Sequence, residues 1–463
     1  MSSTTTATAP TAGDEYLATR LRRPLERVLH LENASGIALV ASALVAIVLA
    51  NSPLREAVDH FWHTHLTVRL GPLLVDESLG HWVNDALMTL FFFVAGLEIK
   101  RELVAGELRD PRRAALPALA ALGGMVVPAL VFVAFTAGSA YSGGWGIPMA
   151  TDIAFAVGVL SLLGDRVPGG LKVFLLSLAI VDDLGAIVVI AIFYSSSLSF
   201  GYLAAAAAGL VMVVVLKRAG VWWVPAYVLL GTAIWYLTFR SGVHATLAGV
   251  AMGLLAPARP HRPRPTAVQV HPGSTLDEVR DILFDARETR SVCDRMIHIL
   301  HPWTAFVVLP LFALANAGVF LGGGVLGSSV TAAVTHGVIG GLIIGKPVGI
   351  GLAAWLAVRF GIATLPRGVT FGQIAGAGLL GGIGFTVSVF IAGLAYTDAA
   401  VVAEAKIGIL VASFAAAGLG AFAIRRSTTA PVAAGGPVGT AATHHPADRE
   451  LEPAPVLTAS VGD

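Results

Sequence analysis

The chain of 463 residues is 56% hydrophobic and only 13% charged, with a mean hydropathy of +0.78. Soluble domains carry about 25% charged residues, so the composition excludes an ordinary soluble protein and favours an all-α polytopic membrane protein. The formal net charge of +1 is uninformative, and we expect no nucleic-acid partner; the single cysteine, Cys293, excludes an intrachain disulfide. No phosphate-binding loop of the Walker type occurs, so ATP-driven pumping has no support.

Residues 1–13 are rich in Ser, Thr and Ala and lack an apolar core, so we expect no signal peptide. We predict a cytoplasmic tail over 1–28, a transporter domain over 29–426, and a disordered cytoplasmic tail over 427–463. Spanning a bilayer takes about 20 apolar residues. Twelve apolar segments are predicted to cross the membrane, at 34–51, 79–98, 114–139, 147–164, 171–195, 201–217, 222–239, 242–256, 303–323, 329–357, 371–396 and 404–424.

Two stretches between the apolar segments have patterns of their own. Leu66–Asp76 alternates and turns at Gly71-Pro72, which predicts a short extracellular hairpin. Its open edge is a candidate contact between two copies, so a homodimer is expected through it. The long loop 257–302 contains Leu276–Arg290, whose apolar spacing predicts a surface amphipathic helix.

Lysine and arginine are concentrated ahead of the first segment, in alternate loops, and after the last segment. Short cytoplasmic loops carry such an excess. Both termini, and the loop 257–302, are therefore expected in the cytoplasm. The even number of spans agrees with this orientation.

Segments four and eleven are poor continuous helices. Gly143–Pro148 opens segment four just before Thr151-Asp152, and five glycines interrupt segment eleven before Phe385-Thr386. Gly and Pro interruptions at corresponding places in two halves point to discontinuous helices and a midplane binding site. The triplets 114–195 and 329–424 would then form an inverted-topology repeat. The alternative is that the glycines only allow close helix packing.

Three acids and one amine lie inside apolar segments: Asp152, Asp182, Asp183 and Lys346. Each buried carboxylate costs roughly 2.5–3.5 kcal/mol even on lenient scales, so the group asks for a counter-charge, a proton or a cation. Adjacent helical residues point about 100° apart, so one of the two neighbouring aspartates would face Asp152 and the other Lys346. We predict a site for Na⁺ at Asp152 and Asp183, where protons compete for the same oxygens.

The natural partner of Lys346 is Asp182. The lysine is either a structural counter-charge or a group that releases a proton, and the sequence does not choose between them. Thr151 either lends its hydroxyl to the site or bonds back to its own helix. Structural hydrogen bonding by all three aspartates is the remaining alternative.

Four further residues are candidates for a response to pH. Glu98, Arg101 and Glu102 fall on nearly one helical face where segment two meets the cytoplasm, as a solvated helix end or as a proton-responsive gate. His244 lies near the outer end of segment eight and is either a packed histidine or a pH sensor. The same ambiguity applies to His298 and His301, at the start of segment nine.

Several stretches together resemble the bacterial NhaA-type sodium/proton antiporters. They occur in family order from segment one to segment twelve, and in combination they are highly specific. They are GLEIKRE (96–102), ATDIAFA (150–156), AIVDDLGAI (179–187), GVHATLAGV (242–250), HPW (301–303), FALANAG (312–318), GKP (345–347) and GFT (384–386).

The resemblance implies a twelve-helix inverted-repeat fold in which discontinuous helices four and eleven cross. It implies electrogenic exchange of Na⁺ or Li⁺ for a larger number of protons in the bacterial inner membrane, activated at alkaline pH, without a cofactor. It assigns cation and proton binding to Asp152, Asp183 and Asp182, pairs Lys346 with Asp182, and assigns the pH response to Glu98, Arg101, Glu102 and His244. Asp85 matches an acidic family position.

One position departs from the family pattern. Ile297 stands directly before His298, where the family often has an acidic residue. This leaves open whether pH is sensed in the same way or over the same range.

Two other classes of function were weighed. A sodium-coupled symporter of an organic solute would need a roomier polar site than these segments offer. An intramembrane enzyme would need a nucleophile or clustered metal ligands beside the aspartates, and the sequence shows neither, so we expect a transporter and no enzyme.

Overall fold

The computed structural model describes residues 32–70, 73–164, 167–195, 198–221, 223–258, 291–322, 327, 329 and 332–428. The expected N-terminal tail, the amphipathic helix Leu276–Arg290, the turn Gly71-Pro72 and nearly all of the C-terminal tail lie outside these residues.

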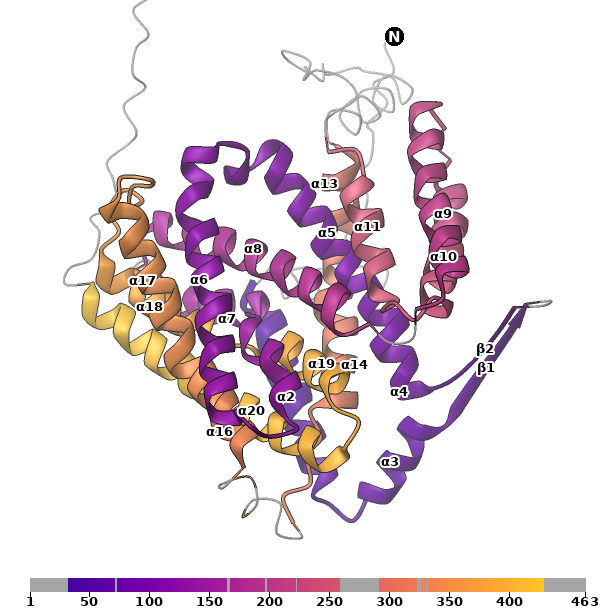
Figure 1. The fold of residues 1–463 in the computed structure, drawn as a ribbon, viewed down its shortest axis with the longest axis horizontal. Helices are drawn as coiled ribbons and strands as arrows, with labels where there is room; N and C mark the ends of the chain where they lie inside the picture. Colours follow the sequence, from indigo (N-terminus) through magenta and orange to yellow (C-terminus); the bar gives the residue numbers. More distant parts are fainter. Residues whose placement is uncertain are drawn as a thin grey trace, which may run out of the picture.

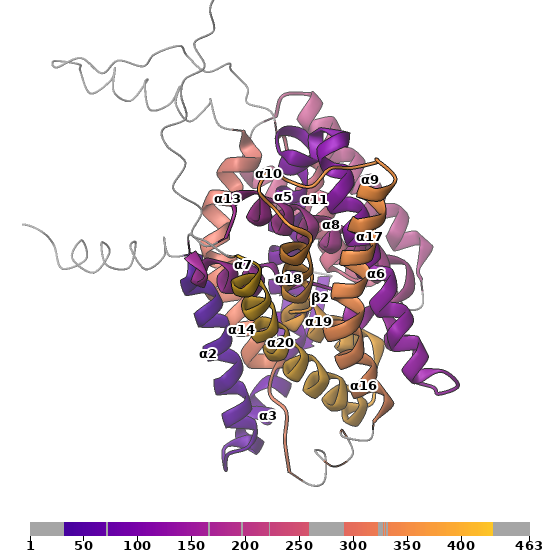
Figure 2. The ribbon, with the colours of Figure 1, turned by 90° about the vertical axis from the view of Figure 1, so that its left-hand side faces the viewer.

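Nearly all of the described chain is helical (Figures 1 and 2). The elements of the first half are α2 (Glu32–Ala50), α3 (Arg55–His63), β1 (His65–Leu70), β2 (Leu73–Ser78), α4 (Leu79–Trp82), the π-helical turn η1 (Val83–Leu87), α5 (Met88–Ala105), the short 3-10 turn η2 (Glu107–Arg109), α6 (Pro111–Thr136), the 3-10 helix η3 (Ser142–Met149), α7 (Ile153–Leu162) and α8 (Gly169–Phe193). Those of the second half are α9 (Phe200–Arg218), α10 (Val224–Arg240), α11 (Thr246–Leu255), α13 (Val292–Trp303), the π-helical turn η5 (Thr304–Val308), α14 (Leu309–Asn316), α16 (Ala333–Gly340), the π-helical turn η6 (Gly341–Gly345), α17 (Lys346–Arg359), α18 (Phe371–Gly381), α19 (Phe385–Ala395) and α20 (Ala399–Ser427).

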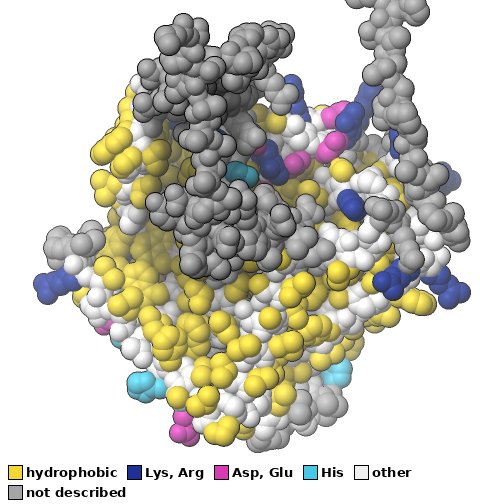
Figure 3. Space-filling model, turned by 180° about the vertical axis from the view of Figure 1, so that it is seen from behind, with side chains coloured by type: hydrophobic (Ala, Val, Ile, Leu, Met, Phe, Trp, Pro, Cys, Tyr) yellow, Lys and Arg dark blue, Asp and Glu magenta, His cyan; other side chains and the backbone are white. Residues whose placement is uncertain are grey.

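Among the described residues, eight helices are long and apolar enough to cross a membrane, or up to ten if each of two bent pairs is one span. The bent pairs are α2 with α3 and α18 with α19. Two of the twelve expected segments correspond to the shorter helices α10 and α11. On the face shown in Figure 3, hydrophobic side chains cover much of the surface that is not grey, and the basic side chains lie in the upper half of the view and at mid-height on its edges.

The helices pack in two groups. Helices α6, α16, α17, α18 and α20 pack mainly on one another, whereas α5 packs on α11 and α13, and α9 on α10. In Figure 1 the first group lies on the left and the second on the right, while α8 runs between them. Helix α8 contacts α6 of the first group and α5 of the second, and so joins the groups.

Two helices are longer than the hydrophobic pattern indicates. Segment two was expected to end at residue 98, but α5 continues to Ala105, and segment nine was expected to begin at 303, but α13 begins at Val292 within the expected loop. Both extensions are amphipathic, so an apolar count stops short of them. Cys293 and Ile297 of the α13 extension form a cluster with Leu97, and Val104 of the α5 extension packs against this cluster.

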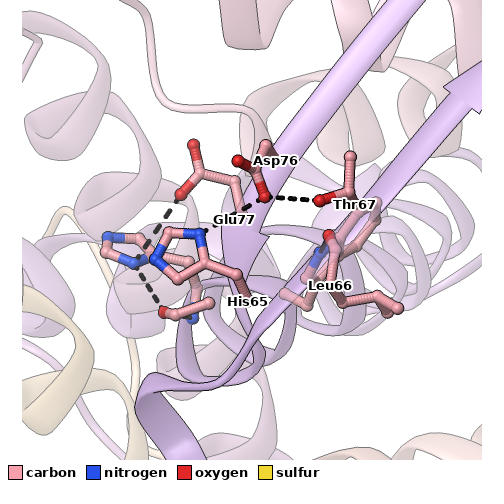
Figure 4. Close-up of polar contacts among 8 residues, drawn as sticks. His65, Leu66, Thr67, Asp76 and Glu77 are labelled. Carbon is pink, nitrogen blue, oxygen red and sulfur yellow. Dashed lines mark hydrogen bonds and ion pairs between the residues drawn. The ribbon is translucent and has the colours of Figure 1, made fainter.

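The hairpin between α3 and α4 forms as the sequence predicts and projects from the body of the molecule (Figure 1). Strands β1 and β2 are antiparallel, with Val68 opposite Val75. The Oδ1 atom of Asp76 accepts a hydrogen bond from the Thr67 hydroxyl at 2.8 Å and lies 3.3 Å from Nδ1 of His65 (Figure 4). The hydrogen bond from Thr67 and the neighbouring His65 lower the pKa of Asp76 below its ordinary value. These cross-strand contacts fix the register on the exposed face.

Candidate cation site at two helix breaks

Segment four is broken just before its aspartate. The 3-10 helix η3 ends at Met149, the chain runs extended through Ala150, and α7 begins at Ile153. Asp152 caps α7, because its Oδ1 accepts the backbone N–H of Phe155 at 3.0 Å. Acidic residues are favoured at this position, where the first amides of a helix lack partners. The break therefore places a buried carboxylate at a helix N-terminus.

Segment eleven is broken between α18 and α19, with a bend of 47°. The two breaks bond to each other: the Asp152 N–H donates to the Ile383 carbonyl at 2.6 Å, and the Thr151 hydroxyl donates to the Gly381 carbonyl at 2.9 Å. Backbone groups freed by a break inside a membrane need partners of this kind. Each break therefore supplies hydrogen-bond partners for backbone groups of the other.

Thr386, at the start of α19, binds the Asp152 carboxylate directly. Its backbone N–H and its hydroxyl both donate to Oδ2 of Asp152, at 3.1 and 2.8 Å. The carboxylate thus accepts amides from the first turns of both α7 and α19. Both helix N-termini carry partial positive charge, which favours the charged form of the acid.

The neighbouring aspartates of α8 have different surroundings. Oδ2 of Asp182 lies 2.7 Å from Nζ of Lys346, and both side chains are fully buried. Nζ of Lys346 also donates to the Met149 carbonyl at the end of η3. The lysine therefore meets one carboxylate and the negative end of a half-helix at once, which is the partnership that the sequence predicts for it.

Asp183 points in another direction, into a cavity of about 240 Å³. Asp152, Thr151 and Thr386 line the same cavity, and Asp182 does not. Within the part of the chain that the structure describes, Oδ1 of Asp183 is buried without a hydrogen-bond partner. Carboxylate and hydroxyl oxygens around one small space form a donor set suited to a hard cation.

The predicted pH-response residues do not form one cluster. Glu98 and Arg101, on α5, line the cavity of Asp183, as does His301 on α13. Glu102 turns toward the end of its helix, where Oε2 accepts the backbone N–H of Glu107 at 3.1 Å. Two members of the set of four therefore share the cavity of the aspartates.

His244 lies in a second cavity, of about 420 Å³, at the hairpin end of α5. Its Nε2 is 3.6 Å from Oδ1 of Asp85, its Nδ1 is 2.9 Å from the Thr246 hydroxyl, and its ring meets Phe390 edge-on. The structure thus separates His244 from Glu98 and pairs it with Asp85. Helix α19 lines both cavities, the first with Thr386 and the second with Phe390.

Sequence reasoning overlooked the part of Thr386. It follows the break in segment eleven just as Thr151-Asp152 follows the break in segment four. Aligning the two interruptions would have placed its hydroxyl opposite the aspartate. The distance between the two residues along the chain conceals the contact.

The comparisons with known proteins agree with this geometry. The family profile described as Na⁺/H⁺ antiporter 1 matches residues 26–424. The chain is 45% identical over 437 residues to the Na(+)/H(+) antiporter NhaA of Oleidesulfovibrio alaskensis, covering 90% of this chain and 96% of that one. It is 46% identical to NhaA 2 of Myxococcus xanthus, covering 85% and 87%, and 44% identical to NhaA 3 of Frankia alni, covering 91% and 93%.

Apolar spans, two helix breaks that bond to each other, and buried carboxylates at those breaks are the features of an integral membrane transport protein. Within that class, the chain belongs to the NhaA family of Na⁺/H⁺ antiporters.

Proposed function

We propose that this protein exchanges Na⁺ or Li⁺ for protons, with the cation bound at Asp152 and Asp183. The observation that carries the proposal is the cavity in which these two carboxylates meet while the charge of Asp182 is balanced by Lys346. Two carboxylates around one small space, neither of them the partner of Lys346, attract either one cation or protons. The curated relatives are all named as antiporters of this kind, which favours antiport over sodium-coupled symport of an organic solute.

The chemistry follows from competition at shared oxygens. A sodium ion entering the cavity replaces protons on Asp183 and Asp152, and Thr151 is close enough to lend its hydroxyl. After the site turns to the other side, protons reload the carboxylates and release the ion. With more protons than cations moved per cycle the exchange is electrogenic, and the proton gradient drives Na⁺ out of the cell.

The proposed arrangement is a twelve-helix inverted repeat in the bacterial inner membrane, with discontinuous helices four and eleven crossing at the site. Supporting it are the paired breaks and the basic side chains in the upper half of Figure 3. By the positive-inside tendency that half is cytoplasmic, as are both termini. The cavity of Asp183 and Glu98 would then open inward, and that of His244 would face outward.

Regulation by pH is proposed for the lining of the inward cavity. Glu98 and Arg101 lie in the same space as Asp183, so a change in their charge alters the field at the site. Glu102 adjoins Arg101 at 3.9 Å and completes the group on α5. His244 and Asp85 are the corresponding proposal on the outward side.

The test is cation-dependent proton movement in proteoliposomes that contain only this protein. After a pH gradient is imposed, addition of Na⁺ or Li⁺ should dissipate it, whereas K⁺ should not. A pH-sensitive dye, placed inside or outside the vesicles, reports the direction of proton movement. Dissipation that required an organic solute in addition to Na⁺ would favour the symporter instead.

A further inference from the structure

The hydroxyls of two tyrosines form hydrogen bonds with the N-terminal part of the broken segment four. The Tyr194 hydroxyl donates to the Gly143 carbonyl at 2.8 Å and accepts the Gly146 N–H at 3.1 Å. The Tyr396 hydroxyl donates to the Tyr141 carbonyl at 2.6 Å. A short 3-10 helix has poor internal hydrogen bonds, so these external ones matter for its position.

The glycines of η3 are what allow the rings to lie so close. A Cβ atom added to Gly146 would stand 3.0 Å from a ring carbon of Tyr194, and one added to Gly144 would stand 2.7 Å from the ring of Tyr396. The rings thus rest on the glycine faces of the half-helix.

The helices that carry these tyrosines also carry the site. Tyr194 follows directly on α8, the helix of Asp183, and by 1.5 Å per residue it stands roughly 16 Å farther along. Tyr396 follows directly on α19, whose first turn supplies Thr386 to Asp152. The N-terminal end of η3 is therefore hydrogen-bonded to residues that follow α8 and α19. These two helices also face Asp152, which lies just beyond the C-terminal end of η3.

The ties continue along η3 toward the site. The Ser388 hydroxyl of α19 donates to the Ile147 carbonyl at 2.7 Å, and Lys346 donates to the Met149 carbonyl. Only two residues, Ala150 and Thr151, then separate Met149 from Asp152. A shift of η3 along its axis would therefore displace the Asp152 carboxylate, because the extended link between them is short.

We propose that the hydroxyls of Tyr194 and Tyr396 are positioning groups for the cation site. They hold η3, and with it Asp152, at a fixed separation from Asp183, and this separation sets the apparent affinity for Na⁺. The inference rests on the proposed antiport function. It assigns to both tyrosines a role at a distance, since neither lies in the cavity of Asp183.

The test is the Na⁺ dependence of exchange in proteoliposomes for Tyr194→Phe, Tyr396→Phe and the double variant. Phenylalanine keeps the ring on the glycine and removes only the hydroxyl. One lost hydrogen bond corresponds to a roughly three- to tenfold change in an equilibrium. The double variant loses three hydrogen bonds, so we expect its half-saturating Na⁺ concentration to rise by at least that factor, with the maximal rate per folded protein retained.

Tyr227→Phe is the matched control. Its hydroxyl also donates to a backbone carbonyl, that of Val221 at 2.8 Å, but on α10, away from η3. We expect no change in half-saturation for this variant. Gly146→Ala is a second probe, because it retains both hydroxyls yet displaces the Tyr194 ring, and it should act in the same direction as the double variant.

Two results would overturn the proposal. One is a half-saturating concentration in the double variant equal to that of wild type and of Tyr227→Phe. The other is a fall in maximal rate or folded yield alone, which would mean that the tyrosines only stabilise the fold. A wild type that shows no exchange at all would instead refute the proposed function, and the positioning role with it.

Discussion

At the scale of single residues, the three buried aspartates Asp152, Asp182 and Asp183 differ in their partners. Asp152 accepts three hydrogen bonds from the first turns of two helices, and Asp182 pairs with Lys346. Within the described residues Oδ1 is buried without a hydrogen-bond partner in both Asp182 and Asp183, but the ion pair with Lys346 is made by Asp182. The acid with the least compensation is therefore the one that most needs a proton or a cation, which is why Asp183 is central to the proposed exchange.

The ion pair of Lys346 and Asp182 gives the first prediction. Removing one partner of a buried pair leaves an uncompensated charge and costs about 3–5 kcal/mol, whereas removing both costs much less. Lys346→Met should thus lower the thermal midpoint of the purified protein sharply, and Lys346→Met with Asp182→Asn should recover most of the loss. Thermal unfolding in detergent measures both.

Lys172→Met, which alters an exposed lysine of α8, is the control for that experiment. It should leave the midpoint almost unchanged. If the single and double variants lose equally in thermal midpoint, the interaction between Lys346 and Asp182 does not contribute to stability.

At the scale of elements, glycines decide how closely the helices approach. Helix α5 meets α11 where a Cβ atom on Gly96 would stand 2.7 Å from the Val250 carbonyl oxygen, and one on Gly253 would stand 2.8 Å from the Leu97 nitrogen. Small residues at such interfaces let the two backbones pack directly on each other. The position of α5 matters for the site, because α5 carries Glu98 and Arg101 into the cavity.

A methyl group at this interface gives the second prediction. Gly253→Ala should destabilise the protein by about 1–3 kcal/mol, because the neighbouring backbone must move to accept it. Gly418→Ala on α20 is the matched control, since an added Cβ there meets nothing within 4 Å. In the control, the gain in helix propensity should leave the thermal midpoint unchanged or raised. If Gly418→Ala lowers the thermal midpoint as much as Gly253→Ala does, the close approach of α5 and α11 is not the cause of the loss.

How far the sequence predicts these elements depends on the physical signal each one gives. The interruptions before Asp152 and Phe385 were predictable because Gly and Pro mark them. The start of α13 at Val292 was not, because its first turns are amphipathic and only Cys293 and Ile297 are buried. The pairing of Thr386 with Asp152, and of His244 with Asp85, depends on tertiary packing that local patterns do not encode.

At the scale of the whole molecule, two groups of helices enclose two cavities, and α19 lines both. Phe390, which lines the second cavity, packs on Phe92 and Phe312 at ring separations of 5.6 and 6.3 Å. The helix that lines both cavities is thus held by aromatic packing. Movement of one group against the other would have to break this packing for the site to change sides.

The projecting hairpin gives the third prediction, a homodimer formed through strands β1 and β2. Val68 is 39% exposed there, and the chain's one cysteine, Cys293, is buried. Val68→Cys should therefore form a disulfide-linked pair of chains on mild oxidation of membranes, detected by non-reducing electrophoresis. Wild type is the control and should remain monomeric on the gel. If Val68→Cys is abundant in the membrane and no linked form appears, the predicted dimer contact through the hairpin is wrong.

The most direct test of the account is Na⁺-induced proton movement in proteoliposomes across roughly pH 6.5–9, where perturbed groups titrate, for wild type, Asp183→Asn and Asp152→Asn. The control is Asp59→Asn, an acid of α3 whose side chain is 73% exposed. Wild type and control should exchange, with a half-saturating Na⁺ concentration that rises as the pH falls, and both site variants should lose exchange at every pH. Retained exchange in correctly inserted Asp183→Asn would contradict the assignment of the cation site.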